Sequence, residues 1–314
     1  MTGTEQLIAA DPEFAARADQ HRRELHVHCY RMLGSFEDAD DAVQDTMLRA
    51  WRSREQYEDG TNLRAWLYRV ATTACLDAIR RRGRQVPALT SFAEVPWLQP
   101  YPDRLLDEAP EEAAVARETI ELGFLAVLQF LPPQQRAVFI LREVLDWPAA
   151  ETATLLETSV PSVNSALQRA RATMRDRLPA RSAEWVTDDP TTEERELVQK
   201  LARAHEECDT SAFTTLIRDD VRVTMPPNPD CYDGLASMAP LHEIAFGPDR
   251  MGDWRLVITR ANRQPTLASY LRRPGDTVFR AFKLDVMRMR EGKVAEFTTF
   301  DATLFPAFGL AATY

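Results

Sequence analysis

The residues best suited to chemistry lie between positions 160 and 178, where polar side chains of the kinds that read DNA recur along one side of the chain. Amide and guanidinium groups match base edges and phosphates in a major groove, and small side chains let the backbone come close. The group comprises Asn164, Ser165, Gln168, Arg169, Arg171, Ala172 and Arg175. We therefore expect a DNA-contacting surface here.

A helix must present this surface, because the apolar residues of the same stretch recur at steps of three and four. They are Val160, Val163, Leu167, Ala170, Met174 and Leu178. Before them, Pro148 suits a helix start, and Glu151 places negative charge in the first turn of a short helix. The stretch from 148 to 178 predicts a helix-turn-helix, with an ordinary helical hairpin as the alternative.

The charge of the chain is segregated, which matters because a net charge of -10 is unusual for a DNA-binding protein. Residues 63–84 hold six arginines and one aspartate, a net charge of +5, whereas residues 85–118 hold seven acids and two arginines, a net charge of -5. DNA binding must therefore be local.

The stretch 36–52 predicts a helix with two stripes. One is apolar and consists of Ala39, Val43, Met47 and Trp51; the other is mixed and consists of Asp41, Gln44, Asp45, Leu48 and Arg52. A helix needs only one buried face, so the mixed stripe indicates a docking surface for a protein partner. A solvated acidic face is the alternative.

The stretch 63–84 predicts a helix that mixes aromatic residues with arginines. Rings stack on unpaired bases and guanidinium groups bind the phosphate backbone, so this composition suits melted DNA. The alternative is that the aromatic residues belong to a core and the arginines form a solvated helix end.

Taken together, these motifs resemble the two signature regions of an extracytoplasmic-function (group 4, sigma-70 family) sigma factor of bacterial RNA polymerase. DADDAVQDTMLRAW resembles the family's core-polymerase-binding motif, RAWLYRVA the helix that helps melt the downstream promoter element, and PSVNSALQRAR the recognition helix for the upstream element.

The resemblance implies roles for individual residues. The contacts to the clamp helices of the largest polymerase subunit are Asp41, Gln44, Asp45 and Leu48. The contacts to the downstream element are Arg64, Trp66, Tyr68 and Arg69, with Arg80, Arg81 and Arg82 on the DNA backbone beside it. The loop 53–62 becomes the pocket for a flipped base. Ser162 joins Asn164, Ser165, Gln168, Arg169, Arg171 and Arg175 on the recognition helix.

Four positions depart from the family's pattern. Glu157 stands where the turn commonly has glycine, Asn164 and Ala166 stand where basic residues are common, and Thr73 replaces a frequent asparagine. These departures bear on the affinity for DNA and on which upstream promoter sequence the recognition helix reads.

Residues 85–117 predict a linker, because five prolines oppose helix formation. In sigma factors the segment that it resembles threads the active-site and RNA-exit channels. Trp97, Leu98 and Tyr101 are unusually apolar for a linker, so we expect them to dock on the chain's own C-terminal domain. A local exposed patch is the alternative.

From residue 190 the pattern changes to helices followed by alternating strands, with REGK as a hairpin turn. This order resembles the nuclear-transport-factor-2-like superfamily, in its SnoaL-like branch. Candidate pocket residues are Asp233, His242, Arg280, Asp285 and Asp301, although no pair stands out by spacing. A regulatory docking module is favoured, with ligand sensing and catalysis as alternatives.

The sequence therefore predicts a multidomain protein. Two all-α sigma domains (region 2 at 1–84 and region 4 with its helix-turn-helix at 118–180) are joined by an extended linker at 85–117, and an α+β NTF2-like cone follows at 190–314. Four scattered cysteines fit neither a disulfide framework nor a CxxC metal site, and His26, His28 and Cys29 are spaced for different helix faces. We expect no metal and no cofactor.

The predicted function is that of a sigma factor, not an enzyme. It binds core RNA polymerase and promoter DNA, helps melt the DNA, and is tuned in cis by its C-terminal domain, where a small-molecule ligand is left open. No apolar run reaches the ~20 residues of a membrane span, so a cytoplasmic location is expected. The alternatives are a stand-alone helix-turn-helix regulator and a cyclase or isomerase with a DNA-binding appendage.

Overall fold

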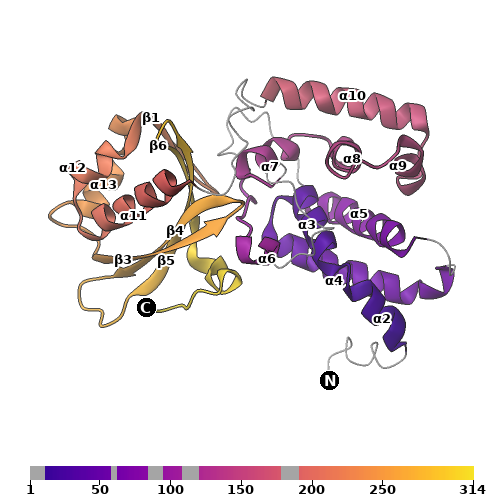
Figure 1. The fold of residues 1–314 in the computed structure, drawn as a ribbon, viewed down its shortest axis with the longest axis horizontal. Coiled ribbons are helices and arrows are strands. Elements are labelled where there is room, and N and C mark those ends of the chain that lie inside the picture. The colour runs from indigo at the N-terminus through magenta and orange to yellow at the C-terminus, as the bar shows by residue number, and fades with distance from the viewer. Residues whose placement is uncertain (1–10, 58–61, 84–94, 108–119, 178–190) are drawn as a thin grey trace. The chain divides into compact units, whose positions relative to one another are not determined.

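The chain folds into two compact units in a computed structural model that describes residues 11–57, 62–83, 95–107, 120–177 and 191–314 (Figure 1). Unit 1 comprises residues 1–88 and 109–183, and unit 2 comprises residues 89–108 and 184–314. Expectations for Arg84, Leu178, the middle of the 53–62 loop and both ends of the 85–117 linker fall outside the described residues.

Unit 1 is helical throughout its described residues. Its helices are α2 (Pro12–Asp19), α3 (Arg22–Leu33), α4 (Phe36–Arg52), α5 (Leu63–Arg82), α7 (Leu122–Gln129), α8 (Pro133–Phe139), α9 (Ala149–Leu155) and α10 (Val160–Arg177), with short turns η1 (Arg54–Gln56) and η5 (Ile140–Val144).

Helices α3, α4 and α5 pack around a shared core, and the sequence sets their ends. Gly34 ends α3 in the left-handed region at φ 71°, and the Ser35 side chain then caps α4 by accepting from the Asp38 amide at 3.2 Å. Asn62 caps α5 in the same way. Leu25, Val43 and Leu67 are fully buried between these helices.

A buried arginine joins this three-helix core to the second helical region. Arg136 of α8 is 4% exposed, and its guanidinium donates to the carbonyl of Met32 at 2.5 Å and to Gln129 Oε1 at 2.6 Å. It also donates to the carbonyls of Gln129 and Leu131. We call this set of bonds the Arg136 clamp; it satisfies the Met32 carbonyl at the C-terminal end of α3 from a helix about one hundred positions away in sequence.

The predicted helix-turn-helix is present as α9 and α10. Val163, Leu167, Ala170 and Met174 are buried, as their spacing predicts, and the Ser159 hydroxyl accepts from the Ser162 amide at the start of α10. Glu157, in the turn, has φ 51°. A non-glycine residue therefore occupies the left-handed conformation that a glycine adopts at no steric cost.

Unit 2 has an α+β architecture. It contains α6 (Asp103–Asp107), α11 (Thr192–Glu206), α12 (Thr210–Thr215), β1 (Ile217–Met225), β2 (Asn228–Asp233), η7 (Leu235–Met238), α13 (Ala239–Phe246), β3 (Asp253–Ala261), β4 (Gln264–Arg272), β5 (Arg280–Arg290), β6 (Lys293–Asp301) and η8 (Ala302–Phe308).

The strands form one six-stranded sheet in the order β2-β1-β6-β5-β4-β3. Only the β1–β6 pair is parallel; the other pairs are antiparallel. Asn262 and Arg263 turn β3 into β4 with positive φ angles, and Glu291 with Gly292 forms the predicted hairpin turn between β5 and β6. Helices α11, α12 and α13 lie together on one side of the sheet (Figure 1).

Helix α11 shows why these helices cover the sheet. Thr191 and Glu194 form a capping box at its start, and its apolar face buries Leu197, Val198 and Leu201 in a core shared with β1, β5 and β6. This is the helix-plus-sheet arrangement expected of an NTF2-like cone. The predicted fold class is confirmed.

Residues 95–107, which we call the strap, belong to unit 2 although they come from the middle of the predicted linker. Pro102 bridges Ala261 at the end of β3, and the strap ends in the short helix α6. This part of the chain is therefore more ordered than the composition of a proline-rich linker suggests, because it bonds to the end of β3 beside the β3–β4 turn.

The Arg136 clamp predicts a large stability loss for Arg136→Leu, because several buried acceptors would lose a charged donor. We expect the free energy of unfolding of the helical unit to fall by about 3 kcal/mol. Urea denaturation followed by far-ultraviolet circular dichroism measures it. Arg81→Leu, at an exposed arginine, is the matched control and is expected to change stability by less than about 0.5 kcal/mol. Equal effects of both substitutions would contradict the clamp.

The φ angle of Glu157 predicts that Glu157→Gly is more stable than Glu157→Ala by about 1 kcal/mol. Both variants lose the same carboxylate, so the difference isolates the backbone strain. Thermal denaturation of the two variants side by side provides the measurement, and an alanine variant as stable as the glycine variant would disprove the strain.

Candidate functional site

The four predicted polymerase-binding residues lie together on one face of α4. Asp41 and Gln44 are exposed, whereas Asp45 and Leu48 are partly buried. Asp45 pairs with Arg49 at 2.8 Å, and the Gln44 amide donates to Asp40 at 2.8 Å. All four line a groove of about 490 Å³ between α4 and α5. The predicted stripe is thus one wall of a groove.

The opposite wall carries arginines that the sequence assigned to DNA. Arg81 and Arg82 line the same groove, and Arg82 forms ion pairs with Asp38 and, at 3.7 Å, with Asp41. Arg80 points elsewhere and pairs with Asp77 at 3.1 Å. Helical periodicity does not predict that Asp41, a predicted polymerase contact, pairs with Arg82, a predicted DNA contact.

Tyr68 lies in the interior instead of on a DNA-facing surface. It is 2% exposed, its hydroxyl donates to Glu24 at 3.1 Å, and its ring packs against Trp147 at 5.3 Å. Burial, together with the nearby Glu24 carboxylate, raises the pKa of the Tyr68 hydroxyl. In this conformation DNA does not reach Tyr68, because Trp147 of the second helical region covers it.

The other three predicted downstream contacts differ in availability. Arg64 pairs with Glu24 at 2.7 Å, and Trp66 is half-buried in a ring cluster with Phe14 and Tyr57. Arg69 is exposed and pairs at 2.5 Å with Glu157, in the turn of the helix-turn-helix. Two of the four residues, Tyr68 and Arg69, therefore contact the second helical region.

Helix α10 presents all seven predicted DNA contacts to solvent. They are Ser162, Asn164, Ser165, Gln168, Arg169, Arg171 and Arg175. Arg171 pairs with Glu143 at 2.6 Å. The N-terminal half of α10 also borders a depression of about 630 Å³ that Thr73 of α5 and Glu157 line as well. Three of the four sequence departures, Thr73, Glu157 and Ala166, therefore line the same depression.

The strap carries the three residues predicted to dock. Leu98 and Tyr101 are 4% and 1% exposed, and Trp97 is half-buried. The Tyr101 amide donates to Asn262 Oδ1 at 2.7 Å, and the Asn262 amide donates back to the Tyr101 carbonyl at 2.9 Å. The strap is held to the β3–β4 turn by two reciprocal bonds, one to the Asn262 side chain and one between backbone groups.

Charged groups extend this contact. Asp103 is 2% exposed, accepts from the Arg263 amide at 2.8 Å and pairs with Arg260 at 3.2 Å. Burial raises the pKa of the Asp103 carboxyl, against the lowering effect of the hydrogen bond and the two arginines. Asp107 adds an ion pair with Arg263, and Arg104 donates to the Ala307 carbonyl at 2.9 Å.

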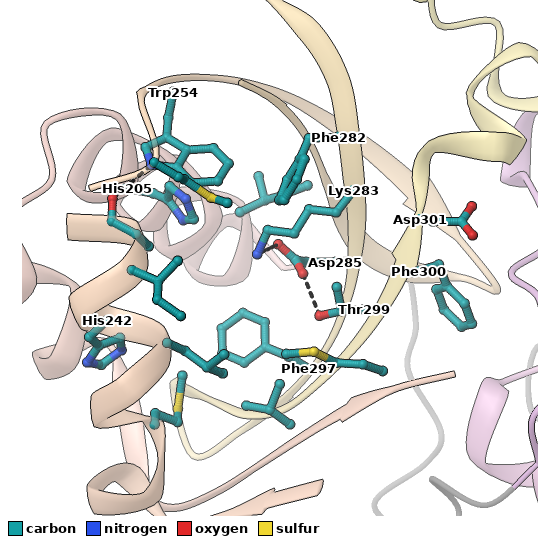
Figure 2. Close-up of a pocket in the computed structure, with 18 of the residues that line it drawn as sticks. His205, His242, Trp254, Phe282, Lys283, Asp285, Phe297, Thr299, Phe300 and Asp301 are labelled. Atoms are coloured by element: carbon teal, nitrogen blue, oxygen red, sulfur yellow. Dashed lines mark hydrogen bonds and ion pairs between the residues drawn. The ribbon is translucent and has the colours of Figure 1, made fainter. Parts of the chain in front are cut away.

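Unit 2 contains a cavity of about 480 Å³ between the helices and the sheet. Of the candidate pocket residues, His242, Asp285 and Asp301 line it, whereas Asp233 and Arg280 are exposed and do not. Figure 2 shows Asp285 between Lys283 and Thr299. Lys283, Thr299 and His205 also line the cavity, and none of the three was predicted from the sequence. The alternation of Lys283 with Asp285 along one strand was the available signal.

Among the residues that the structure describes, no group of three or more His, Cys, Asp or Glu side chains is arranged to hold a metal ion. In the same residues, no helix has both the length and the apolar character to cross a membrane.

Comparison with known proteins agrees with the two helical regions. The family model for Sigma-70 region 2 matches residues 18–85, and that for Sigma-70, region 4 matches residues 122–174. These boundaries enclose α3 to α5 and α7 to most of α10.

Two relatives that align over most of their length come from Mycobacterium tuberculosis. The ECF RNA polymerase sigma factor SigG is 40% identical over 316 aligned positions, covering 95% of this chain and 84% of SigG. SigJ is 27% identical over 285 positions, covering 87% of this chain and 86% of SigJ. The crystal structure of SigJ shares the fold, with a TM-score of 0.62 at 22% identity over 96% of this chain and 99% of that one. The chain therefore belongs to the family of ECF RNA polymerase sigma factors.

Proposed function

We propose that this protein binds core RNA polymerase through the groove between α4 and α5 and directs it to promoters through α5 and α10. The observation that carries the proposal is the placement of a charged, partly apolar groove and the exposed helix α10 on separate faces of one helical unit. The SigG relative supports it, since its name describes a polymerase sigma factor.

In this proposal Asp41, Gln44, Asp45 and Leu48 contact the clamp helices of the largest polymerase subunit. Charged rims with a central apolar group favour fast, specific docking. Binding there competes with the Arg82–Asp41 ion pair, while Arg82 keeps its ion pair with Asp38.

On the DNA side, the exposed α10 residues read the upstream promoter element and the α5 residues act at the downstream element. Tyr68 and Arg69 can act there only after their contacts with Trp147 and Glu157 break. The proposal therefore includes separation of the two sigma regions when polymerase binds. The exposed Arg69–Glu157 pair contributes at most about 1 kcal/mol, so the larger contact that polymerase binding must outweigh is the Arg136 clamp between the same two regions.

We also propose that unit 2 tunes this activity in cis by holding the strap. In the family that the sequence resembles, the equivalent segment enters the polymerase channels, so a strap bonded to Asn262 and Arg263 is withheld from them.

The protein acts in the cytoplasm, beside polymerase and chromosome, and its role is that of a binding subunit and not of an enzyme. Turnover of a small molecule by the purified full chain would overturn that last point.

The polymerase proposal predicts that Asp45→Arg weakens binding to core RNA polymerase at least tenfold. The substitution reverses the charge of a proposed contact residue, and like charges placed against each other across an interface cost more binding free energy than a tenfold loss of affinity represents. Surface plasmon resonance with immobilised core enzyme measures it. Glu55→Arg makes the same charge change at an exposed position outside the groove and is expected to bind normally. Normal binding by a folded Asp45→Arg protein would refute the assignment of the groove.

The regulatory proposal predicts that Asp103→Ala raises promoter-dependent transcription by core enzyme at least twofold, because the strap loses its bonds to Arg260 and Arg263. Asp103→Asn keeps an oxygen acceptor and is expected to have a smaller effect. Asp230→Ala, at an exposed aspartate of β2, is the control. Run-off transcription with full-length proteins tests this, and unchanged output from Asp103→Ala would exclude control through the strap.

A further inference from the structure

Helix α2 adds side chains to the first sigma region that the family match does not include. The Sigma-70 region 2 match begins at residue 18, whereas α2 begins at Pro12. Asp11 caps the helix by accepting from the Phe14 amide at 3.1 Å, and Pro12 suits the first helical position. Phe14 and Arg17, three positions apart, therefore lie on the same face of α2.

Phe14 packs into a group of four aromatic rings where the end of α4 meets the start of α5. Its ring centre lies 6.3 Å from those of Trp51 and Tyr57 and 6.2 Å from that of Trp66, and Tyr57 and Trp66 are 5.6 Å apart. Phe14 and Trp51 are buried, whereas Tyr57 and Trp66 are partly exposed. We call these four residues the ring cluster. Its partly exposed rings are of the kind on which unpaired bases stack.

Two arginines lie against the ring cluster. The Arg17 guanidinium is 5.9 Å from the centre of the Tyr57 ring and donates to the Tyr57 hydroxyl at 3.5 Å. The Arg54 guanidinium is 4.5 Å from the centre of the Trp51 ring and donates to the Trp51 carbonyl at 3.1 Å. A guanidinium has five N–H donors, so both arginines keep donors for a phosphate group.

Neither arginine is neutralised by a carboxylate within the described part of the chain. Asp19 pairs with Arg22 at 2.6 Å, and the exposed Glu13 and Glu55 form no ion pair with Arg17 or Arg54 among the described residues. Other arginines of the same region do pair with a carboxylate, namely Arg49, Arg64 and Arg82. The positive charge at the ring cluster is therefore available to an anion from outside the chain.

We propose that α2 completes a site for single-stranded DNA, in which an unpaired base stacks on Tyr57 and Trp66 while Arg17 and Arg54 bind the adjoining phosphates. Partly exposed rings beside unneutralised guanidinium groups are the combination that holds single strands with little regard to sequence. The inference rests on the proposed function, because promoter melting supplies the unpaired strand. It adds Arg17, Arg54 and Tyr57 to the proposed DNA contacts.

The site is open before the two sigma regions separate. Among the described residues, the hydrogen bonds and ring contacts of Arg17, Arg54 and Trp66 all stay within the first region, unlike those of Tyr68 and Arg69. The full chain without polymerase can therefore be used to test it.

Fluorescence anisotropy of the full-length protein with a labelled oligothymidylate of about twelve nucleotides tests the phosphate contact. We expect Arg17→Gln to weaken binding about fivefold or more. We also expect it to lower the slope of log affinity against log salt concentration by about 0.7, the value for one phosphate contact on a single strand. Arg22→Gln removes the same charge from an exposed arginine that is already paired, and is expected to bind normally.

An abasic strand of the same length tests the stacking, since it has the same phosphates and no bases. We expect the wild type to bind the oligothymidylate about fivefold or more tightly than the abasic strand. Tyr57→Leu is expected to erase this preference, whereas Tyr314→Leu, at an exposed tyrosine of unit 2, retains it.

Three outcomes would overturn the proposal. They are equal binding of the oligothymidylate by Arg17→Gln and the wild type, equal binding of the two strands by the wild type, and absence of binding by the wild type. Because no polymerase is present, these outcomes do not depend on whether the groove between α4 and α5 binds core enzyme.

Discussion

The helical half of this protein depends on one buried guanidinium group. Arg136 supplies donors to the carbonyl of Met32 and to Gln129, so the end of α3 and the start of the second sigma region share the same hydrogen bonds. An unsatisfied buried carbonyl costs more than a formed bond contributes, which makes this contact strongly favoured over partial separation. The two regions that must reach separate promoter elements are therefore held together by a polar contact that water can replace once it is opened.

The packing of the two helical regions of unit 1 against each other explains why several predicted site residues are buried or paired. Trp147 covers Tyr68, and Glu157 pairs with Arg69, so two of the four residues proposed to act at the downstream element are engaged by the chain itself. In the same way Arg82 neutralises Asp41 in the groove proposed for polymerase. An acidic protein can thus carry basic DNA contacts without binding DNA indiscriminately, since several of its arginines are engaged until a partner displaces them.

Periodicity predicted the elements well and their mutual contacts poorly. The buried positions of α10 and the mixed stripe of α4 follow from a spacing of three and four, which is a local property. The burial of Tyr68, by contrast, depends on a tryptophan 79 positions away, and no helical pattern reports which side another region will cover. The polar end of the cavity depends on the register of β5 with β6, so Asp285 was foreseen as a candidate while its partners Lys283 and Thr299 were not.

The strap changes the mechanical connection between the sigma regions. A free connection from residue 84 to residue 119 would be one tether of thirty-six residues, with a maximum reach of roughly 120 Å. Anchoring residues 95–107 in unit 2 removes them from this connection. Shorter tethers raise the effective concentration of one sigma region near the other. Release of the strap would therefore lengthen the tether and favour separation through chain entropy alone, whatever the state of the cavity.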